Sequence, residues 1–351
     1  MAKKKTGPLT EEEILKVLRV QAQGWLAYPN VTSVGVGPKL VDNQPTGELS
    51  IQVSVAKKIR ALRKLAAKGF VKLPRFLRAP DGRRIAVDVV ERSFRLSFKL
   101  VPQPLPPAWV KENQLAPKVR RRRRLARIMP GISVSHPTVL AGTIGAIVYD
   151  RLLGGPCILS NAHVLAGAGT AAGDSIVQPG SSDSADLARN HAGHLLRSHI
   201  GLAGDGAIAS IEGRGFDETL FELGVAPRRL ARAAIGDHVA KSGRTTGVTF
   251  GIVQRTGLVF RHDYGGTIGP QDVGGFEISI DPARPPADGR LCSGGDSGAL
   301  WMIVENGRIT DIAVGLHFAE QTDAASGVDF GLACNLHSVI AKLDVSLLQP
   351  T

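Results

Sequence analysis

The stretch Gly294-Gly295-Asp296-Ser297-Gly298 places a serine among small residues late in the chain. Two earlier stretches complete a pattern with it. A histidine closes the apolar run Ile158-Leu159-Ser160-Asn161-Ala162-His163, and an aspartate opens the run Asp205-Gly206-Ala207-Ile208-Ala209. A serine hydroxyl is a poor nucleophile until a neighbouring base takes its proton, and that base needs a carboxylate to orient it. The set His163, Asp205 and Ser297 therefore predicts nucleophilic catalysis by serine.

The glycines beside Ser297 have a predicted role of their own. Glycine permits backbone conformations that turn neighbouring N–H groups into one small hollow. We expect the amides of Gly295 and Ser297 to hold an oxyanion there. Taken one at a time, a strand-end histidine, a turn aspartate and a glycine-rich hairpin are ordinary structural features. The prediction rests on the three occurring together in this order.

From about residue 128 onward the chain consists of short apolar stretches separated by Gly, Asp and Pro. Many short strands with little helix predict antiparallel β-barrels. The expected strands include residues 142–149, 157–160, 206–211, 238–241, 250–259, 276–280, 299–304 and 312–318.

The first 99 residues predict a small α+β domain with a regulatory or recruitment role. Thr10 followed by three glutamates is a good helix start, and apolar residues follow it at helical spacing, so we expect a helix over 10–24. Strands are expected at 31–36, 49–56 and 84–90, with a basic helix over 57–69.

Residues 100–127 predict a linker to a catalytic domain at 128–351. Four prolines precede five consecutive arginines, Arg120 to Arg124, which repel one another and lack apolar periodicity. Residues 1–127 carry 28 Lys and Arg against 9 Asp and Glu, whereas the rest carries 15 against 22. An acidic partner is one explanation of this asymmetry; mutual attraction of the two halves, or simple solvation of the basic segment, is the other.

Composition excludes several classes of protein. No apolar run is long enough for a membrane-spanning helix, and the basic start lacks the apolar segment of a secretory signal. The three cysteines, Cys157, Cys292 and Cys334, have no metal-binding spacing, and we interpret them as reduced thiols in a cytoplasmic protein, with one disulfide left open.

The three catalytic segments resemble those of the chymotrypsin-fold (trypsin-like) serine peptidases. The finer pattern is similar to an intracellular branch in bacteria and plants, the narrow-leaf-type trypsin-like proteins. The resemblance covers most of residues 130–345 and is carried further by residues 142–146, 158–166, 178–180, 241–247 and 314–319. It implies two packed six-stranded barrels that hydrolyse peptide bonds, with His163 as base, Asp205 as orienting carboxylate and Ser297 as nucleophile.

The resemblance also bears on specificity. The position that is acidic in trypsin, six residues before the nucleophile, is Leu291 here, which argues against cleavage after Arg or Lys. His317 stands where glutamate-specific and picornavirus-type peptidases of this fold carry a histidine. It either binds a Glu or Gln side chain of the substrate or packs on its strand without touching substrate.

Arg127-Ile128 resembles the activation site of trypsin-like zymogens, in which a new N-terminus pairs with the aspartate beside the nucleophile, here Asp296. The following Met129-Pro130-Gly131 departs from the family's usual sequence, and intracellular members generally work unprocessed. Processing at Arg127 is therefore the less favoured alternative.

Two further motifs point to rival chemistry. His191, His194 and His199 suggest a metal site, but no cysteine or well-spaced carboxylate completes the set, so we expect a solvated loop. Residues 241–247 lack the order Gly-Lys-Ser/Thr of a phosphate loop and predict a β-turn. We accordingly expect no cofactor and no metal.

The sequence as a whole predicts a cytoplasmic serine endopeptidase. The alternative is a catalytically silent scaffold on a peptidase fold that recruits an acidic partner through its basic N-terminal half. We expect a protein or peptide substrate, leave open a regulatory or acidic protein partner and a homo-oligomer, and expect neither nucleic acid nor a membrane span.

Overall fold

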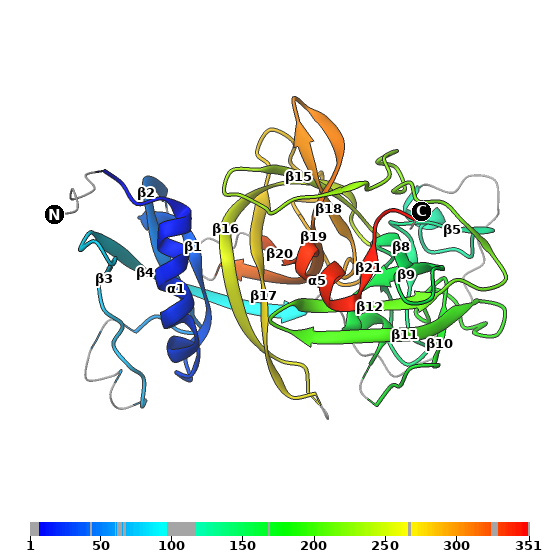
Figure 1. The fold of residues 1–351 in the computed structure, drawn as a ribbon, viewed down its shortest axis with the longest axis horizontal. Helices are drawn as coiled ribbons and strands as arrows, with labels where there is room; N and C mark the ends of the chain where they lie inside the picture. Colours follow the sequence, from blue (N-terminus) through cyan, green and yellow to red (C-terminus); the bar gives the residue numbers. More distant parts are fainter. Residues whose placement is uncertain are drawn as a thin grey trace.

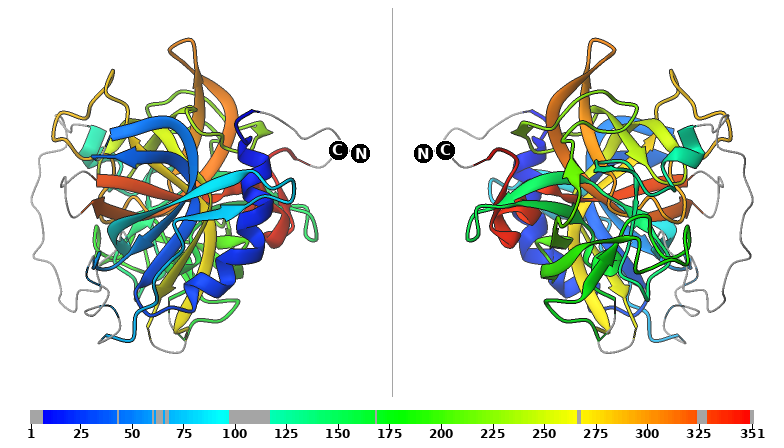
Figure 2. Two further views of the ribbon diagram at one scale, coloured as in Figure 1. Left: turned by 90° about the vertical axis from the view of Figure 1, so that its left-hand side faces the viewer. Right: turned by 90° about the vertical axis from the view of Figure 1, so that its right-hand side faces the viewer.

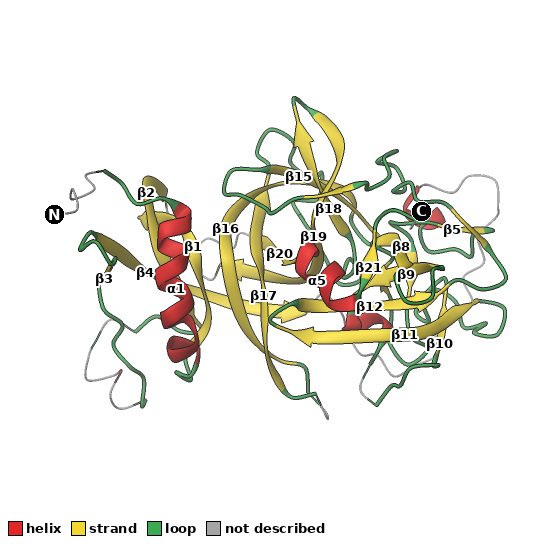
Figure 3. Cartoon of the chain, in the orientation of Figure 1, coloured by secondary structure: helices red, strands yellow, loops and turns green. Residues whose placement is uncertain are grey.

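The computed structural model describes residues 7–42, 44–59, 61, 65, 68–96, 117–167, 169–265, 268–323 and 329–349. Strands dominate it, as the colouring of Figure 3 shows, and the predicted mainly β architecture with a small N-terminal α+β region is confirmed. In Figure 1 the N-terminal region lies at the left, one group of strands fills the middle, and a second group lies at the right.

The N-terminal region consists of one long helix beside a small sheet. Its elements are α1 (Glu11–Leu26), β1 (Val31–Val41), β2 (Gln44–Val55), β3 (Phe76–Arg78) and β4 (Arg84–Leu96). Thr10 begins the helix with a capping box, in which its hydroxyl accepts from the Glu13 amide and the Glu13 carboxylate accepts from the Thr10 amide. The buried faces of α1 and β1 pack together, so both the helix start and its amphipathic face follow the sequence prediction. The end-on view in Figure 2 (left) shows α1 beside these strands.

The right-hand group of strands is a six-stranded sheet in the order β10-β11-β12-β9-β8-β21. Its apolar interior is one continuous cluster of buried side chains, almost all of them aliphatic. The strands are β8 (Ala146–Asp150), β9 (Pro156–Ser160), β10 (Ser175–Val177), β11 (His191–Gly201), β12 (Gly204–Ser210) and β21 (Val345–Ser346). Short elements border it: α3 (Pro117–Arg120), β5 (Arg127–Ile128), β6 (Ser133–Val134), β7 (Gly142–Thr143), α4 (Ala162–Leu165) and β13 (Gly215–Phe216).

The middle group closes into a ring of six strands, β15-β18-β19-β20-β17-β16, because β15 also pairs with β16. The strands are β15 (His238–Gly243), β16 (Gly247–Asp263), β17 (Pro270–Ile280), β18 (Leu300–Glu305), β19 (Arg308–Asp323) and β20 (Asp329–Asn335). The short β14 (Arg229–Leu230) pairs with β19, and α5 (Leu336–Leu343) connects β20 to β21 in the other sheet.

The N-terminal sheet is continuous with this ring. Strand β1 pairs with β16, and the C-terminal half of β4 pairs with β19. With β2 between them, these pairings close a second ring, β19-β20-β17-β16-β1-β2-β4. In Figure 1 the cyan end of β4 accordingly runs out of the N-terminal region toward the middle of the molecule.

The structure extends or leaves aside several predicted elements. Strand β4 continues to Leu96, beyond the expected end at residue 90, and β2 begins before residue 49. The basic helix expected over 57–69 does not begin at residue 57, because residues 57–59 and 61 are not helical; residues 60, 62–64, 66 and 67, and the proline-rich part of the linker, lie outside the described residues. The arginine run is not a uniformly solvated linker, because Arg121 is fully buried and donates to the carbonyl of Gly131 at 2.9 Å and to Ser242 Oγ at 2.6 Å.

Cys157, Cys292 and Cys334 are all buried free thiols, in agreement with the prediction that they are reduced. Among the described residues, no helix is both long enough and apolar enough to cross a membrane.

Candidate active site

The side chains of His163 and Asp205 form a buried pair. His163 lies on the short helix α4 directly after β9, and Asp205 lies near the start of the adjacent strand β12. His163 Nδ1 lies 2.5 Å from Asp205 Oδ2, while the other carboxylate oxygen accepts from the backbone amides of Ala162 at 2.7 Å and His163 at 3.2 Å. Both side chains are almost completely buried. The carboxylate is thus fixed, and it fixes the imidazole ring in turn.

Tyr264 adds a group that sequence reasoning missed. Its hydroxyl donates to Asp205 Oδ2 at 2.9 Å, and burial together with the Asp205 charge raises the Tyr264 pKa well above its ordinary value. The Asp205 amide also lies 3.2 Å from Cys334 Sγ. Tyr264 follows the 17-residue strand β16 and belongs to no motif. Only the path of that strand brings it to the aspartate.

Ser297 lies where the two groups of strands meet. Its carbonyl accepts from the Thr143 amide at 2.7 Å, and its hydroxyl donates to the carbonyl of Phe318 on β19 at 3.2 Å. A Cβ atom at Gly142 would lie 2.5 Å from Val164 Cγ2 and 2.8 Å from the Ser297 carbonyl oxygen. The residue after His163 and the Ser297 backbone therefore both lie close to the same position beside Gly142. The structure brings all three predicted catalytic residues to this junction.

Asp296 holds the Ser297 loop through a second buried carboxylate. Its oxygens accept from the Thr245 amide at 2.8 Å, the Thr246 hydroxyl at 2.6 Å and the Ser293 amide at 3.0 Å. Lys241 Nζ lies 3.3 Å away, and both side chains are fully buried. Burial by itself raises the pKa of Asp296, but Lys241 and these hydrogen bonds outweigh it and leave the pKa below its usual value.

The amides of Gly295 and Ser297 are available as donors. Neither donates a hydrogen bond to any acceptor in the described part of the chain. Gly295 has a φ of 101°, a conformation that favours glycine, and a Cβ atom there would lie 2.6 Å from Thr245 Oγ1. The Gly295 carbonyl points to the Thr143 hydroxyl, from which it accepts at 2.9 Å.

Leu291 and His317 come together against Gly331. A Cβ atom at Gly331 would lie 3.4 Å from His317 Cε1 and 3.5 Å from Leu291 Cδ2. Both side chains are fully buried. Burial, and next the charge of Lys241, lower the pKa of His317 to about 3, so its imidazole is neutral at pH 7.

Arg127 and Ile128 form β5, which pairs in parallel with β13. The Ile128 side chain is fully buried in the core of the six-stranded sheet, and an Arg127 guanidinium N–H donates to the carbonyl of Phe216. In this arrangement the partner of the Asp296 carboxylate is Lys241 and not a chain terminus.

The three histidines considered for a metal separate into a pair and a single residue. His191 and His194 lie on β11 and not in a loop, and Glu212 joins them so that the candidate ligand atoms lie within 4.8 Å of one another. Glu212 is the carboxylate that sequence reasoning missed. His194 Nδ1 and His191 Nε2 lie 2.9 and 3.4 Å from its oxygens, and hydrogen bonds from Ser210 and His194 lower the pKa of Glu212 to about 2. His199 lies farther along β11, outside this group.

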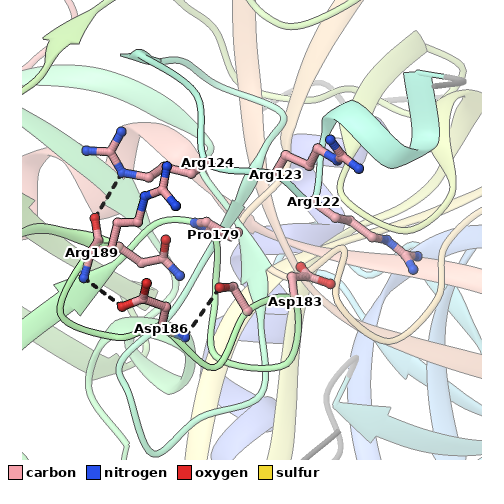
Figure 4. A pocket seen from close by; sticks show the side chains of 9 residues that line it. Arg122, Arg123, Arg124, Pro179, Asp183, Asp186 and Arg189 are labelled. Atoms are coloured by element: carbon pink, nitrogen blue, oxygen red, sulfur yellow. Dashed lines mark hydrogen bonds between the residues drawn. The ribbon is translucent and has the colours of Figure 1, made fainter. Parts of the chain in front are cut away.

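Part of the arginine run lines a surface cavity of about 290 Å³ (Figure 4). Arg122, Arg123, Arg124, Arg189, Asp183 and Asp186 are among its lining residues, and Arg124 lies beside Arg189, to whose carbonyl its Nε donates at 2.9 Å. Asp183 is ion-paired with Arg244. The cavity therefore mixes both signs of charge.

The solved structures to which the chain is similar are chymotrypsin-fold serine proteases. Thermobifida fusca protease A is 18% identical, with 64% of this chain and all of that chain covered and a TM-score of 0.45. A Nocardiopsis protease is 15% identical, with 63% of this chain and 98% of that chain covered and a TM-score of 0.44. A glutamic acid-specific serine protease, said to use a histidine triad in substrate binding, is 17% identical, with 63% of this chain and all of that chain covered and a TM-score of 0.44. No family model matches the chain, and comparison with the curated proteins gives no match. At these identities the likeness concerns the fold and assigns no residue a role.

Proposed function

We propose that the protein is a serine endopeptidase with Ser297 as nucleophile, His163 as general base and Asp205 as the carboxylate that orients His163. The observation that carries the proposal is the buried 2.5 Å contact between His163 Nδ1 and Asp205 Oδ2, at the junction where Ser297 also lies. An imidazole fixed at Nδ1 by a carboxylate presents Nε2 as a base, which is what a serine nucleophile needs.

In the proposed reaction Ser297 Oγ attacks the carbonyl carbon of the peptide bond while His163 takes the hydroxyl proton. The amides of Gly295 and Ser297, which have no acceptor within the described residues, stabilise the oxyanion. His163 then gives its proton to the departing amine, and an acyl-enzyme remains. Water releases the acyl group by the same steps in reverse, with His163 again as base.

The Asp296–Lys241 pair supports activity in the intact chain. A zymogen-type mechanism would need a new N-terminus to neutralise Asp296, and Lys241 already supplies a buried positive charge at that carboxylate. We therefore propose that cleavage between Arg127 and Ile128 is not required. N-terminal sequencing of active protein tests this point, since an intact N-terminus is expected.

For specificity we propose a substrate side chain that accepts or shares a hydrogen bond with neutral His317, namely Glu or Gln, beside the apolar Leu291. The two residues lie together against Gly331 with both side chains fully buried, so this role requires the substrate side chain to enter at that position. Cytoplasmic location and kinship with the intracellular narrow-leaf-type branch remain proposals that rest on the sequence motifs and the free thiols.

The test of the activity is cleavage of an internally quenched peptide library by wild type, Ser297→Ala and the matched control Ser293→Ala. We expect wild type and Ser293→Ala to cleave and Ser297→Ala to be inactive, with Glu or Gln enriched before the cleaved bond. Folded wild type that cleaves nothing favours the silent scaffold, and cleavage after Arg or Lys contradicts the role given to Leu291.

A further inference from the structure

Three segments of the chain follow one another along one edge of β19. Strand β18 pairs with β19 from Glu305↔Arg308 to Leu300↔Leu316. The Ser297 loop follows, with the Gly298 amide donating to the His317 carbonyl at 2.8 Å and the Ser297 hydroxyl donating to the Phe318 carbonyl. From Ala319 onward β4 takes over the same edge, because β20 occupies the other one.

The direction of β4 relative to Ser297 is that of a peptide approaching the nucleophile. The antiparallel register runs from Arg92↔Asp323 to Leu96↔Ala319, so the chain approaches Phe318 as its residue number rises. The described pairing ends one residue of β19 short of Phe318. A peptide aligned in this way places residues N-terminal to its cleaved bond along residues 319–323.

We propose that β4 is an intramolecular occupant of the substrate-binding edge of this enzyme, and that an extended peptide must displace residues 92–96 from β19 to be cleaved. The proposal rests on the proposed peptidase function. Addition of a strand to a free sheet edge is a general mode of peptide binding, and here a strand of the chain itself fills that edge.

The contacts of the Arg92 side chain indicate which residue type a competing peptide carries at the same position. Arg92 is 4% exposed, its guanidinium lies 4.0 Å from the Phe330 ring centre, and its Nη2 lies 4.0 Å from Glu277 Oε1. Glu277 is itself fully buried. A cation stacked on an aromatic ring near a buried carboxylate is a specific contact, so the competing peptide has Arg or Lys at this position.

The contacts beneath Arg92 persist when Arg92 leaves. Arg255 Nη1 lies 3.2 Å from Glu277 Oε2, and Gln321 donates to the same oxygen. Glu277 therefore keeps a buried cation and a neutral donor without Arg92. Displacing residues 92–96 therefore leaves no buried charge without a partner in the ring of strands. A segment that can be displaced must meet this condition.

The first test weakens the pairing with Phe94→Pro and Arg95→Pro. Alternate amides of an antiparallel strand point to its neighbour, so one of two adjacent prolines must remove a ladder hydrogen bond. We expect that variant to cleave the peptide library at least about tenfold faster, through a lower KM for peptides extended on the N-terminal side of the cleaved bond. Lys72→Pro, in an exposed loop of the same region, is the control and should match wild type.

The second test locks the strand in place. Ser93 and Thr322 are opposed in the register, at a Cα separation that a disulfide spans. In Ser93→Cys/Thr322→Cys, we expect the oxidised form to cleave peptides at least about tenfold more slowly than the reduced form. A small fluorophosphonate, which needs no sheet edge, should label Ser297 equally in both forms.

These readouts separate the two proposals. The proposal that β4 occupies the edge is overturned if the oxidised and reduced forms of Ser93→Cys/Thr322→Cys cleave peptides equally fast and neither proline variant is faster than wild type. The proposed peptidase function is unaffected by that result. Absence of fluorophosphonate labelling in every variant overturns the peptidase instead. In that case the occupancy of the edge is tested by the binding of a fluorescent peptide with the sequence of residues 90–96, measured by anisotropy. The peptide should bind the reduced form of Ser93→Cys/Thr322→Cys more tightly than the oxidised form. Equal binding curves would overturn the proposal.

Discussion

Two buried carboxylates of the candidate site, Asp205 and Asp296, are held in comparable ways. Each accepts two backbone amides at one oxygen, Ala162 and His163 for Asp205 and Thr245 and Thr246 for Asp296. Each also accepts a hydroxyl group, from Tyr264 in the first case and from Thr246 in the second.

The difference lies in the basic partner. Asp205 contacts an imidazole, the side chain most often used for proton transfer in catalysis, whereas Asp296 contacts the amino group of a lysine. A similar set of hydrogen-bond donors around a buried carboxylate therefore supports proton transfer at Asp205 and a fixed loop at Asp296. Substitutions of the two carboxylates and of the side chains that contact them test this division of roles.

The largest expected effect comes from Asp205→Asn. The change preserves shape but no longer enforces the imidazole tautomer that can accept the serine proton, so kcat for peptide cleavage should fall by about 10⁴-fold, the size of effect known for this substitution in a serine peptidase triad. Asp150→Asn, at a buried carboxylate paired with Arg197, is the matched control. It should lower stability while the folded protein stays active. Near-normal activity of Asp205→Asn would remove Asp205 from the mechanism.

Lys241→Met should have the next largest effect. It leaves the buried Asp296 charge unpaired, which costs about 3–5 kcal/mol in the free energy of unfolding. The loosened Ser297 loop should reduce kcat by roughly 10²-fold through misplaced oxyanion donors. Adding Asp296→Asn should restore part of the lost stability, as measured by urea unfolding. Lys342→Met, at an exposed lysine, should change neither property. If the double variant is less stable than Lys241→Met, the pair is not the unit described above.

Tyr264→Phe should have a smaller effect. It removes one hydrogen bond to Asp205 and keeps the ring, which corresponds to about tenfold in kcat/KM. The carboxylate that loses this donor becomes a better acceptor for His163, so the apparent pKa in the rate profile should rise. A profile that coincides with that of wild type would limit Tyr264 to packing.

The last prediction concerns the pH dependence of stability contributed by His317, which leaves activity at neutral pH out of account. Its pKa is about 3 in the folded protein and about 6.5 when unfolded, so the unfolded chain binds more protons between these values. The contribution is fully present above about pH 6.5 and is lost as pH falls toward 3, with a slope of up to about 1.4 kcal/mol per pH unit. Lys241, Asp296 and His163 are the charged groups that act on it. His317→Gln should flatten the urea-unfolding stability curve in this window, and an unchanged slope would contradict the burial of a neutral His317.

Residue chemistry singled out His163, Asp205 and Ser297, because the histidine closes one apolar run, the aspartate opens another and the serine lies among glycines. Tyr264 and Lys241 could not be assigned their partners from the sequence. Their contacts depend on how β16 and β15 are placed in the ring of strands. The alternation of apolar and polar residues that identifies β2 is absent from residues 91–96, and the sequence predicts a strand over 84–90 alone. Its continuation onto β19 is set by a vacant sheet edge and not by local propensity.

The most direct test of the central claim is the mass of the intact protein after reaction with a small fluorophosphonate, followed by peptide mapping. Ser297 Oγ should displace fluoride and form one phosphonate ester, and Ser297→Ala should remain unlabelled while Ser293→Ala labels as wild type does. His163→Ala should label far more slowly. Folded wild type that acquires no adduct, or an adduct at another serine, would contradict the assignment of Ser297 as the activated nucleophile.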